Sequence, residues 1–238
     1  MLHVFDMDGT LLPGTSATRE MAKVFGHAPA IEALEKDFSS GRIDTHRFAR
    51  SMFQLWGPMD PARVRLAFDA SPKMRRIREV VADIGARGHR SAVVTMSPLC
   101  FADYFCELGF DEVHGSVFPT AAGSDIDVEV VLRPADKPLI ADTMRVRYGI
   151  PPEHVVAYGD SLSDRDLFAA VPVSVAVNGD AHVRPLASVA YTGRDLWEAY
   201  ELALSVLPVR GLPSRAADLE FPSGCRASVF SGSSVAPA

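Results

Sequence analysis

Cysteine is scarce in this sequence and follows no recognisable pattern. The 238 residues include three cysteines, Cys100, Cys106 and Cys225, an odd number without the C-x-x-C spacing of zinc and redox motifs. We therefore expect reduced thiols, with neither a disulfide framework nor a zinc site. A signal-peptide run is missing as well, because the carboxylate of Asp6 interrupts the apolar N-terminus. We therefore expect a cytoplasmic protein.

Long apolar runs and an excess of positive charge are also missing. No segment approaches the roughly 18 consecutive apolar residues that a membrane-spanning helix needs. Lysine and arginine number 24 against 30 aspartates and glutamates, which gives a formal net charge of -6. Nucleic acids and anionic membranes require a basic surface, so neither is an expected partner. An anionic substrate would have to be bound by local groups.

The loops that bind nucleotides are absent too. Neither a GxxxxGK loop nor a G-x-G-x-x-G turn occurs where a strand would pass into a helix, and no repeat of 20 to 50 residues is visible. With 47% hydrophobic and 23% charged residues, the composition is that of an ordinary globular protein. The length suits one large domain or one domain with a smaller insertion.

Short apolar runs and helical patterns alternate over much of the chain. The runs predict strands at 2–5, 91–95, 155–158 and 173–177, and the helical patterns cover 99–108, 137–147, 167–171 and 196–207. This alternation predicts an α/β fold, a doubly wound parallel sheet with helices on both faces. Segments 113–118 and 128–132 are interpreted as a further strand and a hairpin.

A helical insertion and a tail complete the predicted organisation. From about residue 16 to 88 the pattern is helical, with breaks at Gly26, Gly41, Pro58 and Pro72. From about Pro208 the chain is rich in Pro, Gly, Ser and Ala, which is typical of a loose tail. The predicted parts are an α/β core at 1–14 and 73–207, a helical insertion at 15–72 and a flexible tail at 208–238.

Two acidic clusters follow predicted strands. Asp6 and Asp8 leave the first strand on the same side, while Asp160 and Asp164 follow the strand at 155–158. A lone aspartate more often caps a helix or forms a turn. Two acidic strand ends together favour a ligand site, because ligands of open parallel sheets bind at the carboxyl ends of the strands. Close carboxylates repel unless a cation joins them, and a hard oxygen site suits Mg²⁺.

Four segments together resemble the signatures of the haloacid dehalogenase (HAD) superfamily phosphatases. The segment FDMDGTLL at 5–12 resembles the first signature, and GDSLSD at 159–164 resembles the fourth. The apolar strand ending at Thr95 resembles the second, and Lys137 at the start of a helix resembles the third. The resemblance covers about residues 1–207, and within the superfamily the chain is most similar to the phosphoserine phosphatase-like branch.

This resemblance implies a Rossmann-like core with an inserted cap and a Mg²⁺-dependent phosphomonoesterase activity. Asp6 would be the nucleophile that forms an aspartyl-phosphate, and Asp8 the general acid and base. Asp6 and Asp160 would bind Mg²⁺ through their side chains and Asp8 through its backbone carbonyl. Asp164 would hold coordinated water.

Two further residues are implied to bind the substrate phosphate. Thr95 would donate a hydrogen bond to the phosphoryl group, and Lys137 would add a compact positive charge beside the phosphate and Asp6. Ser97 is an alternative to Thr95, although the strand register favours Thr95. The simpler interpretation of Thr95 is an ordinary strand hydroxyl, and that of Lys137 is a solvated lysine at a helix start.

The cap is expected to determine which small phosphorylated metabolite is the substrate. Phosphoserine phosphatases have a glutamate shortly after the first signature that holds the substrate ammonium, whereas here Pro13-Gly14-Thr15-Ser16 contains no acidic residue. A sugar, polyol or amino-alcohol phosphate is therefore at least as suitable as phosphoserine. The alternatives are a phosphotransferase or phosphomutase on the same fold, and a catalytically silent binding module, which the four retained carboxylates disfavour.

Overall fold

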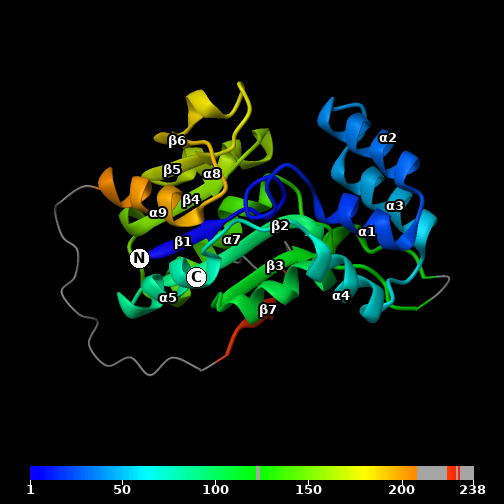
Figure 1. Cartoon of the computed structure of the whole chain (residues 1–238), viewed down its shortest axis with the longest axis horizontal. Helices are drawn as coiled ribbons and strands as arrows, with labels where there is room; N and C mark the ends of the chain where they lie inside the picture. Colours follow the sequence, from blue (N-terminus) through cyan, green and yellow to red (C-terminus); the bar gives the residue numbers. More distant parts are fainter. Residues whose placement is uncertain (122–123, 208–223, 229, 231–238) are drawn as a thin grey trace, which may run out of the picture.

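A parallel β-sheet forms the centre of the protein (Figure 1). The computed structural model describes residues 1–121, 124–207, 224–228 and 230. In this part of the chain the sheet has seven strands in the order β6-β5-β4-β1-β2-β3-β7, and every paired neighbour is parallel. The strands are β1 (Leu2–Phe5), β2 (Arg90–Pro98), β3 (Glu112–Ser116), β4 (Val155–Gly159), β5 (Val173–Val177), β6 (Val189–Tyr191) and β7 (Arg226–Ser228).

Strand β1 lies in the middle of the sheet, between β4 and β2. All four of its residues are buried, because helices cover both faces of the sheet. Leu2 and Val4 pack toward α7 and α8 in one apolar cluster, whereas Phe5 packs toward α5 and α9 in another. Burial on both faces explains why three of the four residues of β1 are apolar, and the helices on both faces confirm the predicted doubly wound α/β fold.

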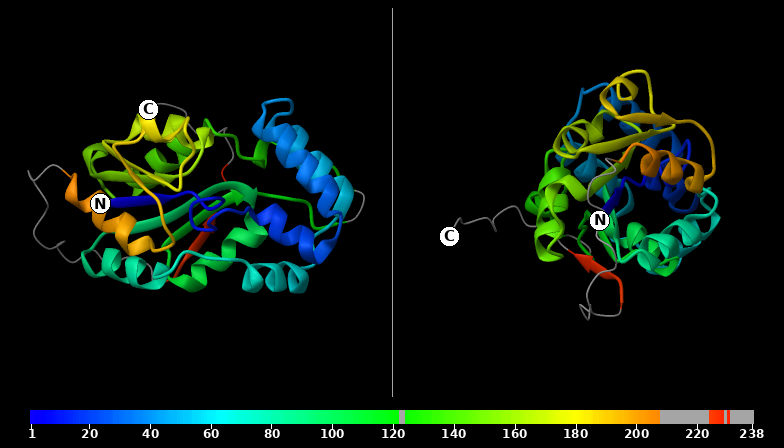
Figure 2. Two further views of the ribbon diagram at one scale, coloured as in Figure 1. Left: turned by 45° about the horizontal axis from the view of Figure 1, so that its top comes forward. Right: turned by 90° about the vertical axis from the view of Figure 1, so that its left-hand side faces the viewer.

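The covering helices form two layers, which Figure 2 shows above and below the sheet. One face carries α5 (Ile77–Ala86), α6 (Leu99–Ala102) and α9 (Leu196–Ser205), and the other carries α7 (Asp136–Arg147) and α8 (Arg165–Ala170). Short 3₁₀ helices are η1 (Asp103–Leu108), η2 (Val128–Val130), η3 (Pro152–His154), η4 (Leu162–Asp164) and η5 (Arg184–Leu186).

Four helices, α1 (Ala17–Phe25), α2 (Ala28–Ser39), α3 (Thr45–Trp56) and α4 (Pro61–Ala70), lie between β1 and α5 in the sequence. Ser16 caps the N-terminus of α1 through its side chain, and Gly26 ends that helix. Helices α1 and α4 join the main apolar cluster of the core, while α1, α2 and α3 enclose a smaller cluster around Ile31 and Met52. Figure 1 shows α1, α2 and α3 beyond the carboxyl ends of β1 and β2. We call these four helices the cap.

The predicted hairpin at 128–132 is wrong. Val128–Val130 forms a 3₁₀ helix, because the Asp127 side chain accepts a hydrogen bond from the Glu129 N–H at 3.0 Å and so stabilises a turn. The N–H of Val117, the residue after β3, donates a hydrogen bond to the carbonyl of Val130 in this 3₁₀ helix, at 2.9 Å. Residues 122–123 of the expected connection lie outside the described residues.

The expectation of reduced thiols is wrong for two of the three cysteines. Cys106 and Cys225 form a disulfide across a sequence separation of 119 residues, and Cys100 is free. Beside Cys225, the segment Arg226–Ser228 pairs with β3 as β7, so part of the predicted tail is an edge strand. Three mostly exposed residues give no apolar pattern from which a strand could be predicted. Residues 208–223, 229 and 231–238 of the tail lie outside the described part of the chain.

None of the helices in the described residues combines the length and apolarity needed to cross a bilayer. The division into core, cap and tail stays a prediction.

Candidate active site

The carboxyl end of β1 opens into a cavity of about 740 Å³ between the sheet and the cap. Asp6 follows directly after β1, and its N–H donates to the Tyr158 carbonyl at 2.8 Å. Met7 turns into the apolar core, whereas Asp6 and Asp8 border the cavity. The alternation of side chains along an extended backbone therefore places both carboxylates at one site.

Gly9 brings the loop after β1 against the second acidic segment. Its φ angle is +74°, and a Cβ atom at this position would lie only 1.9 Å from Asp160 Oδ2. Only glycine meets both conditions, since it lacks a Cβ and adopts positive φ without strain. The close approach holds the Asp160 carboxylate next to the loop that carries Asp6 and Asp8.

Three carboxylates converge beneath this loop. Asp6, Asp160 and Asp164 each offer an oxygen, and these oxygens lie within 4.8 Å of one another. Asp164 is fully buried, and its Oδ2 accepts hydrogen bonds from the N–H groups of Asp160 at 3.0 Å and Ser161 at 3.3 Å. Because both Asp164 oxygens already accept protein hydrogen bonds, Asp6 and Asp160 are the better candidates for direct metal ligands. The donor set is all oxygen, which fits Mg²⁺.

Lys137 joins two of these carboxylates from the start of α7. Its Nζ lies 2.7 Å from Asp6 Oδ1 and 2.6 Å from Asp164 Oδ1, and the side chain is almost fully buried. Burial alone would lower the pKa of Lys137, but Asp164 and Asp6 outweigh that effect and raise it. Lys137 is therefore a permanent cation.

The site nevertheless has an excess of negative charge. Burial raises the pKa of Asp6, Asp164 and Asp8 raise it further, and Lys137 opposes them. Burial also raises the pKa of Asp160, with Asp6 and Asp164 adding to the effect. One ammonium cannot balance this group of carboxylates, so the residues are suited to a divalent cation.

Asp8 is held by the cap and by β2. Its Oδ1 accepts the N–H of Ala17 at 2.6 Å, and its Oδ2 accepts the Ser97 hydroxyl at 2.6 Å. Burial raises the pKa of Asp8, the hydrogen bonds from Ser97 and Ala17 lower it, and the charge of Glu35 raises it, so that the net value is about 6. A carboxyl group with this pKa can carry a proton near neutral pH.

Thr95 and Ser97 both border the cavity at the end of β2. The Thr95 hydroxyl lies 3.5 Å from Asp8 Oδ2 and accepts the Ser97 N–H at 3.1 Å, whereas the Ser97 hydroxyl lies closer to Asp8. The structure thus brings together both hydroxyls that the sequence offered. Which of them binds the phosphoryl group stays a prediction.

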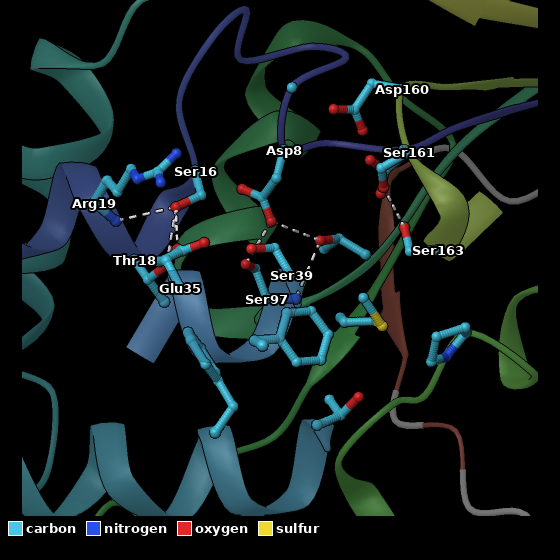
Figure 3. A pocket seen from close by; sticks show the side chains of 18 of the residues that line it. Asp8, Ser16, Thr18, Arg19, Glu35, Ser39, Ser97, Asp160, Ser161 and Ser163 are labelled. Carbon is cyan, nitrogen blue, oxygen red and sulfur yellow. Dashed lines mark hydrogen bonds between the residues drawn. The ribbon is translucent and has the colours of Figure 1, made fainter. Parts of the chain in front are cut away.

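Sequence reasoning missed Glu35 of α2, which also borders the cavity. Its Oε1 accepts the Ser16 hydroxyl at 2.5 Å and the Thr18 hydroxyl. Figure 3 shows Ser16, Thr18 and Glu35 grouped together next to Asp8. In the sequence Glu35 is one acidic residue of many on a helix, and only the packing of α2 against α1 brings it to the site.

The chain is similar to known proteins over most of its length. The family model described as haloacid dehalogenase-like hydrolase matches residues 3–169. A phosphoserine phosphatase of Idiomarina loihiensis is 25% identical over 204 residues, which are 83% of this chain and 90% of that protein. A phosphoserine phosphatase of Archaeoglobus fulgidus is 23% identical, over 82% of this chain and 57% of that protein. This chain therefore spans little more than half of the archaeal relative.

Solved structures show the same fold. A substrate-bound phosphoserine phosphatase complex superposes with a TM-score of 0.74 at 22% identity, over 84% of this chain and 97% of that one. A HAD family hydrolase of Salmonella enterica serovar Typhi gives a TM-score of 0.75 at 18% identity, over 88% of this chain and 71% of that one.

Proposed function

Because this chain belongs to the haloacid dehalogenase-like hydrolases, we propose that it is a Mg²⁺-dependent phosphatase that hydrolyses a small phosphate ester through an aspartyl-phosphate on Asp6. The observation that carries the proposal is the convergence of Asp6, Asp160 and Asp164 with Lys137 at a cavity that Asp8 also borders. The names of the curated relatives support hydrolysis of a phosphate ester.

In the first step, Asp6 attacks phosphorus. Lys137 binds Oδ1 of Asp6, which leaves Oδ2 for the attack. A bond forms between Oδ2 and phosphorus while the ester P–O bond breaks, and the departing alkoxide takes a proton from Asp8. The raised pKa of Asp8, at about 6, allows this residue to hold the proton beforehand.

In the second step, water hydrolyses the aspartyl-phosphate. The water oxygen attacks phosphorus, its proton passes to Asp8, and the bond between phosphorus and Asp6 breaks. Inorganic phosphate leaves, and both Asp6 and Asp8 return to their starting states. One proton leaves Asp8 and one returns, so the cycle balances.

Negative charge on the phosphoryl oxygens must be offset in both steps. Lys137 supplies a buried cation beside Asp6, and Thr95 or Ser97 supplies a hydroxyl donor. Mg²⁺ would be held by the side chains of Asp6 and Asp160 and the backbone carbonyl of Asp8, with Asp164 positioning coordinated water. When bound, it would neutralise charge on the phosphoryl group and orient it.

The cytoplasmic location predicted from the sequence remains a prediction. The pairing of Cys106 with Cys225 does not favour it, because structural disulfides are rare in reducing compartments.

The substitution Asp6→Asn tests the proposed nucleophile. We expect Mg²⁺-dependent phosphate release from 4-nitrophenyl phosphate to fall by about a thousand-fold or more, because an amide oxygen cannot replace the attacking carboxylate. Phosphate is measured without an acceptor alcohol, which separates hydrolysis from transfer. Chelation of Mg²⁺ should abolish the wild-type activity, and adding the ion back should restore it.

Asp125→Asn is a suitable control, since Asp125 is exposed and does not border the cavity. It should retain wild-type turnover. Residual turnover above about a tenth of wild type in a folded Asp6→Asn protein would refute the nucleophile assignment.

A further inference from the structure

We infer that Glu35 selects a substrate whose leaving alcohol carries an ammonium group on an apolar body and has no carboxylate. The class is the phosphate esters of apolar amino alcohols. This inference rests on the proposed function, because it concerns the alcohol half of the ester that Asp6 would attack.

The Glu35 carboxylate is fixed in position but retains capacity to bind. Its Oε1 accepts hydroxyl hydrogen bonds from Ser16 and Thr18, and Ser16 is itself held as the N-cap of α1. Within the described residues, no protein group donates to Oε2 and no cation pairs with Glu35. An ammonium group on a bound ligand can therefore make a charge-assisted hydrogen bond to Oε2.

A carboxylate on the leaving group would have no comparable partner. Arg19, the cap cation at the cavity, is bound to Glu32 through two nitrogen–oxygen contacts of 3.1 Å. Figure 3 shows the Arg19 side chain on the far side of Ser16 from Asp8. Lys137 is occupied by Asp6 and Asp164. Among the described residues, no other lysine or arginine lines the cavity, so a substrate carboxylate would face Glu35 without an uncommitted cation there.

The wall beside Glu35 is mainly apolar, although Ser39 and Thr45 also line the cavity. It contains Phe38 on α2, Phe48 and Met52 on α3, and Phe118, and the rings of Phe38 and Phe48 lie 5.5 Å apart. An alkyl or aromatic group beside the ammonium would be buried against this wall. A sugar or polyol would bury much less apolar surface against these side chains.

The test compares two esters that differ only in the amine. Phenylalaninol phosphate has an ammonium and a phenyl group, and 3-phenylpropyl phosphate lacks the ammonium. For the wild-type protein with Mg²⁺ we expect kcat/KM to be at least about ten-fold higher for the first, the effect of one hydrogen bond between charged groups. In Glu35→Gln the ratio should fall to about one. Asp37→Asn, on the same helix but outside the cavity lining, should keep the wild-type ratio, because its partner Arg42 does not line the cavity either.

A second pair of esters isolates the carboxylate. Phosphoethanolamine and phosphoserine differ by that group alone, and phosphoethanolamine should have the higher kcat/KM. The inference is wrong if the wild-type ratio for the phenyl esters is near one, if that ratio is unchanged in folded Glu35→Gln, or if phosphoserine is preferred. In each of these cases, phosphate release would leave the proposed function intact. Absence of phosphate release from every ester, including 4-nitrophenyl phosphate, would overturn both.

Discussion

Gly9 is the residue at which the two acidic segments touch. A methyl group at this position would displace the Asp160 carboxylate, because the added carbon would lie 1.9 Å from its oxygen. We therefore expect Gly9→Ala to raise the Mg²⁺ concentration needed for half-maximal activity by at least about ten-fold, which a metal titration of phosphate release would measure.

Gly149 provides a matched control for this substitution. It also has a positive φ, +63°, but an added methyl group would meet no atom within 4 Å. Gly149→Ala should therefore lower stability without changing the metal requirement. The assignment of Asp160 as a metal ligand is wrong if Gly9→Ala and Gly149→Ala need the same Mg²⁺ concentration.

Ser97 tunes the proton affinity of Asp8. Its hydroxyl stabilises the charged carboxylate and so lowers the pKa of Asp8; burial opposes this effect, and the net pKa is about 6. Ser97→Ala should raise this pKa, so that Asp8 keeps its proton to higher pH. Since the first step needs protonated Asp8, the alkaline limb of the kcat/KM profile should move to higher pH.

A pH–rate profile for 4-nitrophenyl phosphate measures this shift. Ser40→Ala is the control, because the Ser40 hydroxyl bonds to the Asp37 carbonyl on the exposed surface of the cap. An alkaline limb that stays in place or moves to lower pH in Ser97→Ala would count against Asp8 as the proton donor.

The acidic residues of the site were predictable, whereas the cap residues were not. Asp6, Asp8 and Asp160 follow apolar strands, and parallel strands bring their carboxyl ends together whatever the details of packing. Glu35 reaches the cavity only through the packing of one cap helix on another, to which no local pattern corresponds.

Among the elements, β7 is a short strand next to a covalent link. It has three residues at the edge of the sheet, and Cys225 beside it is bonded to Cys106 of η1. Cys225→Ser should lower the free energy of unfolding by about 2 to 5 kcal/mol, since the bond closes a long loop in the unfolded chain. Urea unfolding without reductant would measure the loss, and Cys100→Ser should leave the midpoint unchanged.

A thiol titration of the unfolded wild-type protein, again without reductant, gives an independent check. One reactive thiol, from Cys100, is expected. Three reactive thiols would show that the disulfide does not form in solution.

Elements with a strong apolar pattern were predicted well, and those without one were missed. The strands β1 and β5 begin and end at the predicted residues. Helix α7 begins at Asp136, one residue before its predicted start. The segment 128–132 has the composition of a strand, but the Asp127 side chain turns the backbone there. Strand β6 has only three residues, too few for periodicity to be visible.

For the molecule as a whole, stability should depend on pH through a buried histidine pair. His3 of β1 is fully buried, and its ring stacks near that of His89. Burial lowers the pKa of His3 well below 6.5, with His89 adding to the effect, and lowers the pKa of His89 to about 4. Below about pH 6.5 the unfolded chain binds protons that the folded protein does not, so stability falls as the pH falls.

The substitution His3→Asn isolates this contribution. Between pH 6.5 and pH 5 the free energy of unfolding should fall less steeply than in wild type, by about 1 kcal/mol per pH unit. Denaturant unfolding at several pH values would measure both slopes. His27→Asn, at an exposed position with positive φ that asparagine tolerates, should keep the wild-type slope. Parallel slopes for His3→Asn and wild type would contradict the expected role of His3.

The hydrogen bond from the Ala17 N–H to Asp8 ties the proposed proton donor to the first residue of α1. A movement that lifted this helix would also remove one of the two anchors that aim Asp8. Binding and turnover would then be coupled. An ester that occupied the phosphate position while α1 was displaced would meet an Asp8 carboxyl group that is not correctly oriented. Such an ester would be cleaved slowly, however tightly it bound.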